Sequence, residues 1–223
     1  MAQVEKKVYC FWTGRNAIPP QRGACLDTMY KNIGVPVEMI DWRVLPRYVL
    51  PEAPLHEGFR YLSCNHKSDY LRCYFCHFYG GGYSDIKWYV PQNNWKLCFD
   101  IINHFPQIEV IGQAERIGGS PIKDFNLPDN LPKMLANCYF ICRPRSEFTQ
   151  AWYNRLQGRM DVFLPMLRDN PATEPFGGTN YRVPWASLMG EIFHETIMEF
   201  RSKKPEAVCS ALMTGCDMTK RWR

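Results

Sequence analysis

Apolar and polar segments alternate along this chain in the manner of an α/β protein. Short apolar runs typical of buried strands occupy residues 8–13, 37–41, 83–88, 108–114, 134–142 and 207–212. Apolar residues recur at helical spacing in the intervening residues 23–32, 68–79, 94–103, 147–167 and 185–201. This order predicts a three-layer sandwich, in which helices flank a central, mixed and mostly parallel sheet.

Loops are expected where glycine, proline and polar residues gather, at residues 14–20, 46–58, 118–133 and 170–184. Pro165 is expected to interrupt the helix predicted at 147–167. The chain has 223 residues, of which 46% are hydrophobic, and no long polar tract divides it. This is enough for one sizeable core, so a single domain over residues 1–223 is expected.

Residues 68–87 are the most informative part of the chain. Ser68 is a favourable N-cap, which would place Asp69 where the helix dipole favours an anion. The helical spacing predicts a core-facing side made of Tyr70, Leu71, Tyr74, Phe75 and Phe78. Three glycines at 80–82 suit a left-handed C-cap, and the next strand carries Asp85 to an exposed end. Open α/β sheets bind ligands beyond such carboxyl ends.

The same segment resembles nucleotide-sugar glycosyltransferases of the DXD sugar-binding-region type. The residues that match the pattern of this family are Ser68, Asp69 and Arg72 in its first half and Gly81, Gly82, Tyr83 and Asp85 in its second. The resemblance implies a GT-A-like fold and transfer of a hexose or deoxyhexose from a UDP- or GDP-sugar to a glycan or glycoprotein hydroxyl. It also implies retention of anomeric configuration, without an obligatory protein nucleophile. The compact chain resembles bacterial or algal-virus (chlorella virus) members.

Lys87 stands where the family pattern has a second acidic residue. Two carboxylates at this spacing can together hold Mn²⁺ or Mg²⁺, whereas a carboxylate and an ammonium group cannot do so in the same way. Alternate residues of an extended strand point to the same side, so Lys87 is expected beside Asp85. We expect Asp85 to contact ribose, sugar or a divalent cation, and Lys87 wholly or partly to replace the metal. The alternatives are a turn-capping Asp85 and a solvent-facing Lys87.

Asp69 and Arg72 lie one helical turn apart and share a helix face. The resemblance assigns this helix to the nucleotide pocket, with roles on ribose or base. The alternative is a surface ion pair that contributes about 0.2–0.5 kcal/mol.

The end of the first predicted strand is a second candidate for donor binding. Family members place base-binding groups at the position of Phe11, Trp12 and Thr13. An aromatic face can stack on a base, and backbone groups can contact its edge. A core aromatic residue before a turn is the alternative.

Two further segments carry weaker resemblances to donor-binding residues. Asn137 resembles an asparagine whose amide contacts donor sugar hydroxyls, although a capping or turn residue would look the same. Gly177, Gly178 and Thr179 loosely resemble a phosphate-side loop, since glycine lets backbone N–H groups approach phosphate oxygens.

Charge and targeting signals restrict the class of protein further. The net charge of +5 is modest and its basic residues are dispersed, which indicates no nucleic-acid partner. No apolar run is long enough to span a membrane, and no signal peptide is expected at the start of the chain. A cytoplasmic protein is therefore expected, in the host cytoplasm if the chain is viral. Its ten cysteines are expected to be reduced core residues.

Other motifs are excluded by their context. Cys73, Cys76 and His77 match the c-type haem attachment spacing, but they complete an apolar helical face and no export signal accompanies them. His194 and Glu195 could reach a site, but the second histidine of a zinc-protease motif is replaced by Met198.

Two functions other than glycosyl transfer stay open. One is a non-catalytic nucleotide- or carbohydrate-binding protein with a degenerate site, for which the Lys87 substitution is the main argument. The other is an unrelated α/β structural or assembly protein. In that case residues 68–87 form an ordinary helix–strand unit.

Overall fold

A central sheet of six strands organises the fold. The structure, a computed structural model, describes residues 3–115, 134–211 and 213–217. The strand order is β2-β1-β3-β6-β5-β7. The strands are β1 (Val8–Trp12), β2 (Val37–Asp41), β3 (Gly81–Ser84), β5 (Val110–Ala114), β6 (Leu135–Cys142) and β7 (Val208–Ala211). Neighbouring strands are parallel except where β6 pairs with β3 and β5, so the predicted mixed, mostly parallel sheet is confirmed.

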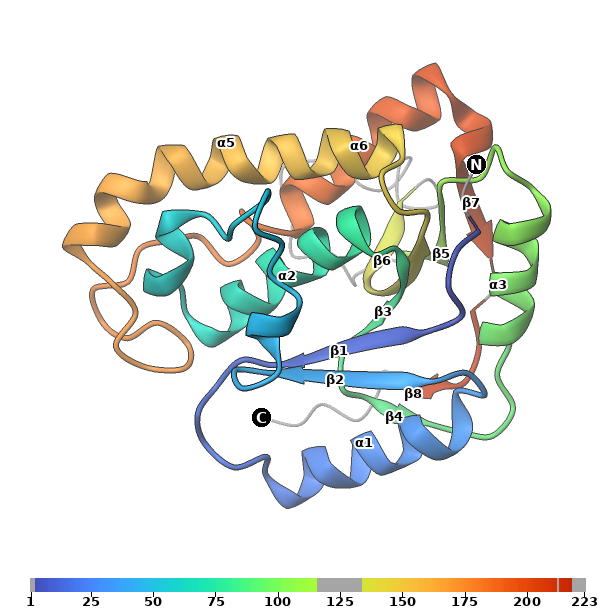
Figure 1. The fold of residues 1–223 in the computed structure, drawn as a ribbon, viewed down its shortest axis with the longest axis horizontal. Coiled ribbons are helices and arrows are strands. Elements are labelled where there is room, and N and C mark those ends of the chain that lie inside the picture. Colours follow the sequence, from blue (N-terminus) through green and yellow to red (C-terminus); the bar gives the residue numbers. More distant parts are fainter. Residues whose placement is uncertain (1–2, 116–133, 212, 218–223) are drawn as a thin grey trace.

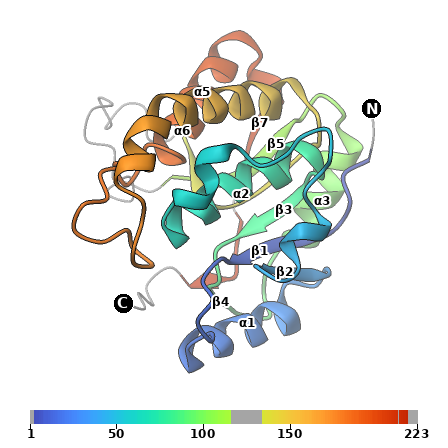
Figure 2. The ribbon, with the colours of Figure 1, turned by 60° about the vertical axis from the view of Figure 1, so that its left-hand side comes forward.

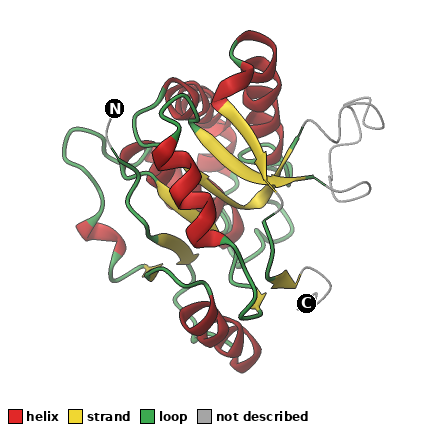
Figure 3. Cartoon of the chain, turned by 90° about the vertical axis from the view of Figure 1, so that its right-hand side faces the viewer, coloured by secondary structure: helices red, strands yellow, loops and turns green. Residues whose placement is uncertain are grey.

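Helices cover both faces of this sheet (Figures 1 and 2). One face packs against α2 (Cys64–Phe78), α5 (Glu147–Asp169) and α6 (Gly190–Lys203). The opposite face packs against α1 (Pro20–Asn32) and α3 (Trp95–His104). Figure 3 shows helices on both sides of the strands. This three-layer α/β architecture is consistent with the GT-A-like sandwich expected from the sequence.

Strand alternation distributes the side chains between two cores. Tyr9 and Phe11 of β1 point to the α2 side, whereas Val8 and Cys10 point to the side of α1 and α3. None of the ten cysteines forms a disulfide and seven are buried, as expected of reduced core residues. Among the described residues, no helix has the length and apolar character that crossing a bilayer requires.

Several short elements were not predicted from the sequence. β4 (Trp88–Tyr89) and β8 (Cys216–Asp217) form a separate antiparallel pair. Short 3-10 helices lie in the connections that the structure describes, namely η1 (Leu45–Arg47), η2 (Glu57–Tyr61) and η4 (Pro205–Ala207). The loop predicted at 118–133 lies outside the described residues.

The start of α2 was predicted wrongly. The helix begins at Cys64, one turn before the predicted start, because the side chain of Ser63 accepts a hydrogen bond from the N–H of His66. Ser68 is therefore inside the helix, and Asp69 lies beyond the first turn, where the dipole contributes little. The C-terminal prediction is confirmed, since Gly80 has φ of 66° and its N–H donates to Phe75 O.

Three other boundaries differ from the predictions. β3 ends at Ser84 and the chain bends at residue 86, so the predicted strand does not reach residue 88. α5 continues through Pro165 because buried side chains on both sides of it, Met160 and Leu167, keep the helix packed. α6 begins at Gly190 instead of residue 185, since residues 185–189 form turns.

Candidate functional site

One edge of the sheet gathers the polar residues singled out in the sequence. The carboxyl ends of β1, β2 and β3 lie at this edge, together with the amino end of the antiparallel β6. Helix α2 precedes β3 and runs back over the sheet, so its N-terminus lies at the same edge (Figure 1). Residues from α2, β3 and β6 therefore converge although they are distant in the sequence.

Arg72 is the centre of a buried polar cluster at this edge. Its Nη1 donates to Asn137 O at 2.7 Å. Its Nη2 lies 2.9 Å from Asp69 Oδ1 and 3.6 Å from Asp85 Oδ1. The guanidinium carbon is 4.4 Å from the ring centroid of Tyr83, a distance typical of a cation–π contact. Arg72 therefore ties α2 to β3 and to β6.

Tyr83 is the fourth residue of the cluster and contacts Asp85. Its hydroxyl donates to Asp85 Oδ1 at 2.6 Å, and its ring stacks on Phe11 with centroids 5.6 Å apart. The Asp85 side chain keeps 31% of its surface exposed, so it is fixed on one side and accessible on the other. Tyr83 matches the family pattern in the sequence, but only the structure shows its hydrogen bond to Asp85.

The Asp69–Arg72 pair is not the surface ion pair considered as an alternative. The two side chains are only 14% and 9% exposed. Burying two charges costs hydration free energy that the attraction between them has to offset, so the small energy of an exposed pair does not describe Asp69 and Arg72. Both residues are therefore members of the buried cluster.

Burial sets the protonation behaviour of this cluster. It raises the pKa of the Asp69 carboxyl to about 6, with Arg72 opposing the shift and Asp85 adding to it. Burial also lowers the pKa of Arg72, but Tyr83, Asp69 and Asp85 outweigh that effect and raise it above its ordinary value. Arg72 is consequently always charged, whereas Asp69 titrates at mildly acidic pH.

Lys87 follows the bend after β3, so strand alternation does not decide its direction. It forms no ion pair with a carboxylate of the described residues. Burial raises the pKa of the Cys138 thiol, Asp85 raises it further, and Lys87 lowers it. Asp85 and Lys87 have the same opposing effects on the pKa of Cys216, which burial also raises. The charged groups of Asp85 and Lys87 are thus both close to these two thiols. That the two side chains lie side by side stays a prediction.

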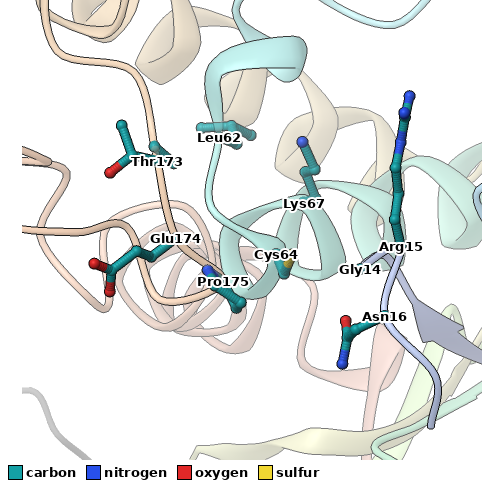
Figure 4. A pocket seen from close by; sticks show the side chains of 10 residues that line it. Gly14, Arg15, Asn16, Leu62, Cys64, Lys67, Thr173, Glu174 and Pro175 are labelled. Carbon is teal, nitrogen blue, oxygen red and sulfur yellow. The ribbon is translucent and has the colours of Figure 1, made fainter.

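A pocket of about 320 Å³ lies between the β1–α1 loop, the N-terminus of α2 and the loop after α5 (Figure 4). Its lining residues are Gly14, Arg15, Asn16, Leu62, Cys64, Lys67, Ala172, Thr173, Glu174 and Pro175. The charged ends of Arg15 and Lys67 point in the same direction (Figure 4). The only sequence signal that could have indicated this pocket is a glycine followed by a basic residue, Gly14 and Arg15, directly after the first predicted strand.

Backbone and side-chain hydrogen bonds fix the walls of this pocket. Thr13 Oγ1 donates to Cys64 O at 2.7 Å, and Cys64 N donates to Pro175 O at 2.9 Å. Trp12 Nε1 donates to Asn16 O at 2.9 Å. Half-buried Trp12 and Thr13 therefore shape the pocket, although neither side chain lines it.

Phe11 does not reach this pocket. It is buried against Phe75 and Tyr83, with ring centroids 5.1 Å and 5.6 Å away. The core alternative therefore describes Phe11, because its ring is buried and packs on two other aromatic rings.

The weaker sequence candidates occupy different places. Asn137 is in β6, where its backbone carbonyl accepts a hydrogen bond from Arg72 and the residue is half-buried. The N–H of Gly177 donates to Glu174 O at 2.9 Å, so it is not free for a phosphate oxygen. Thr179 is exposed. Residues 177–179 thus form a turn of the loop, and Gly177 and Gly178 adopt φ of 115° and 88°.

His194 and Glu195 serve packing between elements. His194 is buried and its Nε2 contacts Leu135 O at 3.0 Å, whereas Glu195 pairs with Arg155 and Arg159 of α5. Neither residue belongs to the cluster.

The residues at the cluster do not fit a cation held by the protein alone. Within the described ranges there is no group of three or more His, Cys, Asp or Glu side chains placed to hold a metal. Asp69 and Asp85 already share the guanidinium of Arg72, and Asp85 also accepts from Tyr83. No step through a metal is derived from this geometry.

Comparison with known proteins gives a distant structural likeness. No protein family matches the sequence, and no curated protein matches it. A solved structure described as "PaToxG Glycosyltransferase" matches with a TM-score of 0.47 and 12% identity, over 91% of this chain and 70% of that one. At this level of similarity the function has to be inferred from the residues of the chain itself.

Proposed function

We propose that the chain is a GT-A-like glycosyltransferase that moves a hexose or deoxyhexose from a UDP- or GDP-sugar to a glycan or glycoprotein hydroxyl. The observation that carries this proposal is the buried cluster of Asp69, Arg72, Tyr83 and Asp85. These are the motif residues by which the sequence resembles the family, and two separate elements bring them together at the ligand-binding edge of the sheet.

The pocket beside β1 is the place we propose for the nucleoside part of the donor. A volume of about 320 Å³ is within the range of small-ligand pockets. Cys64 and Lys67 of α2 line it, whereas Asp69, two residues after Lys67, lies on a different face of the helix. The diphosphate and sugar of a nucleotide in this pocket would extend past the start of α2 towards Asp69 and Asp85.

The chemistry requires stabilisation of a leaving nucleoside diphosphate while the anomeric carbon becomes cation-like. Asp85, held by Tyr83 and Arg72, would orient the sugar or ribose hydroxyls. Lys87, with Arg15 and Lys67 nearer the pocket, would supply positive charge to the phosphates. With retention, the bond from the anomeric carbon to phosphate breaks as the acceptor oxygen bonds on the same face. The leaving phosphate then takes the acceptor proton.

Two measurements test this function. Calorimetric titration with UDP and GDP, with and without Mn²⁺, is expected to show binding that Asp85→Asn weakens. A panel of nucleotide sugars, followed by detection of released nucleotide, is expected to show turnover. Binding without turnover would favour the non-catalytic alternative, which the lysine at position 87 supports. Absence of nucleotide binding would instead favour an unrelated α/β protein.

The role of Lys87 is tested separately from the activity. If its ammonium replaces the metal, turnover persists in EDTA and Lys87→Ala lowers kcat by about 10²–10³, as for loss of one electrostatic donor. Lys96→Ala, an exposed lysine on α3, is the matched control. Strict dependence on Mn²⁺ together with an active Lys87→Ala variant would refute this role. Cytoplasmic residence stays a prediction.

A further inference from the structure

The connection from α5 to α6, residues 170–189, is long and contains no helix or strand. Such segments in compact domains are usually functional or disordered. Here hydrogen bonds join the backbone of this connection to α2 and to the residues that precede α2. Ala172 N donates to Tyr61 O, and Pro175 O accepts from Cys64 N, each at 2.9 Å. The connection is therefore held in a defined conformation.

Tyr181 and His66 fix the second half of this connection. The Tyr181 hydroxyl lies 2.7 Å from His66 Nδ1 and accepts from Ser63 N at 3.4 Å. The other nitrogen of His66, Nε2, lies 3.3 Å from Trp185 O. His66 is itself buried. Two side chains thus hold the backbone at Trp185 against α2.

The indole of Trp185 is nevertheless 61% exposed. Its ring centroid lies 6.2 Å from that of His66, at an interplanar angle of 49°. A large apolar ring that is rigidly held but left open to water contributes little to folding. Its exposed surface is therefore available to a ligand.

The position of Trp185 relates it to the polar cluster. His66 and Asp69 are neighbours on the surface of α2, about 4.5 Å apart along the helix axis. Tyr181 lies close enough to Asp69 for that carboxylate to raise its pKa, in addition to the effect of burial. Trp185 therefore contacts the residue one helical turn before Asp69, whereas Cys64 and Lys67 line the nucleoside pocket.

The surroundings of Trp185 indicate the size and polarity of its ligand. Residues next to it in the chain, Asn180, Arg182 and Pro184, are exposed, and two of them are polar. One exposed indole is too small a patch for a membrane or a stable protein interface. It matches one pyranose ring, whose C–H face is apolar and whose edge carries hydroxyls.

We propose that Trp185, backed by His66 and Tyr181, is the acceptor subsite and stacks on the C–H face of a neutral pyranose. This inference rests on the proposed function. The nucleoside pocket, Asp85 and Trp185 would then hold the nucleotide, the transferred sugar and the acceptor, respectively. The stacked acceptor would extend one hydroxyl towards the sugar held at Asp69 and Asp85.

An array of pyranose-terminated glycans, probed with the whole protein in the presence of UDP, tests the subsite. The wild-type protein is expected to bind a subset of these glycans. Trp185→Ala should weaken that binding about tenfold, as loss of one aromatic contact would, and Trp185→Phe should restore part of it. Tyr30→Ala removes a comparably exposed aromatic residue from α1 and should leave binding unchanged. Calorimetric affinity for UDP and GDP should be the same in all four proteins.

The outcomes separate this proposal from the function on which it rests. If a nucleotide binds but no glycan does, or Trp185→Ala binds glycans like the wild-type protein, the acceptor subsite is wrong and the transferase proposal survives. If neither nucleotide binds to the wild-type protein, the transferase proposal itself fails. An equal loss in Tyr30→Ala would also overturn the subsite, since binding would then not depend on Trp185 in particular.

Discussion

Asp69→Asn gives the most direct test of the buried cluster, because it changes a charge while it nearly preserves shape. Burial raises the pKa of Asp69 from 3.8 to about 6. Each pKa unit corresponds to about 1.36 kcal/mol, so the shift amounts to about 3 kcal/mol. The folded protein binds this proton more tightly than the unfolded chain does. Its free energy of unfolding therefore falls as pH rises from about 4 to about 6.

The asparagine side chain cannot ionise, so the variant lacks this loss. At pH 4 both proteins present a largely neutral side chain to Arg72 and should have similar stability. By pH 7 the variant should be more stable relative to wild type by about 3 kcal/mol. Urea unfolding of both proteins at a series of pH values measures the difference, and equal m-values confirm that the unfolded states are comparable.

A stability difference that does not change with pH would refute this reasoning. A difference of opposite sign, with wild type gaining stability as pH rises, would show that the attraction of Arg72 outweighs burial. In that case the Asp69 pKa would be depressed, and the pair would resemble an ordinary stabilising ion pair.

Three further substitutions test separate parts of the structure. Tyr83→Phe removes the hydrogen bond to Asp85 and should cost about 1.5–3 kcal/mol in urea unfolding together with a lower turnover; unchanged values for both would mean that Tyr83 does not hold Asp85. Gly82→Ala would place a Cβ 2.7 Å from the Trp95 ring, so thermal unfolding should show about 1–3 kcal/mol of destabilisation. An unchanged stability would contradict the close packing of β3 on α3. Ser146→Ala removes the cap of α5 and should cost about 1 kcal/mol without altering UDP affinity; a change in affinity would reveal an unexpected coupling of α5 to the pocket.

The order of strands and helices could be predicted from the sequence because its signals are local. Residues 37–41 were predicted as a strand and form β2 without change, since short apolar alternation needs no distant partner to be recognised. The prediction for α2 failed at its start because Ser63 and Ser68 are both plausible caps. Only the observed hydrogen bond from His66 N to Ser63 decides between them.

The candidate site, too, could be predicted from the sequence only in part. Asp69, Arg72 and Asp85 were identified from residue type and spacing, but spacing could not show that Arg72 also binds the carbonyl of Asn137. It could not show that Phe11 is covered by Phe75 and Tyr83 either, because burial depends on which elements pack against the strand.

The amino-acid sequence alone therefore determined the α/β class, the strands and helices in order, and the carboxylates and cations available for chemistry. These properties follow from local periodicity and side-chain type. The tertiary structure decided which side chains meet, how deeply Asp69 is buried and that His66 contacts an exposed Trp185. Dielectric environment, hydrogen-bond geometry and exposure arise only when segments distant in the chain pack together.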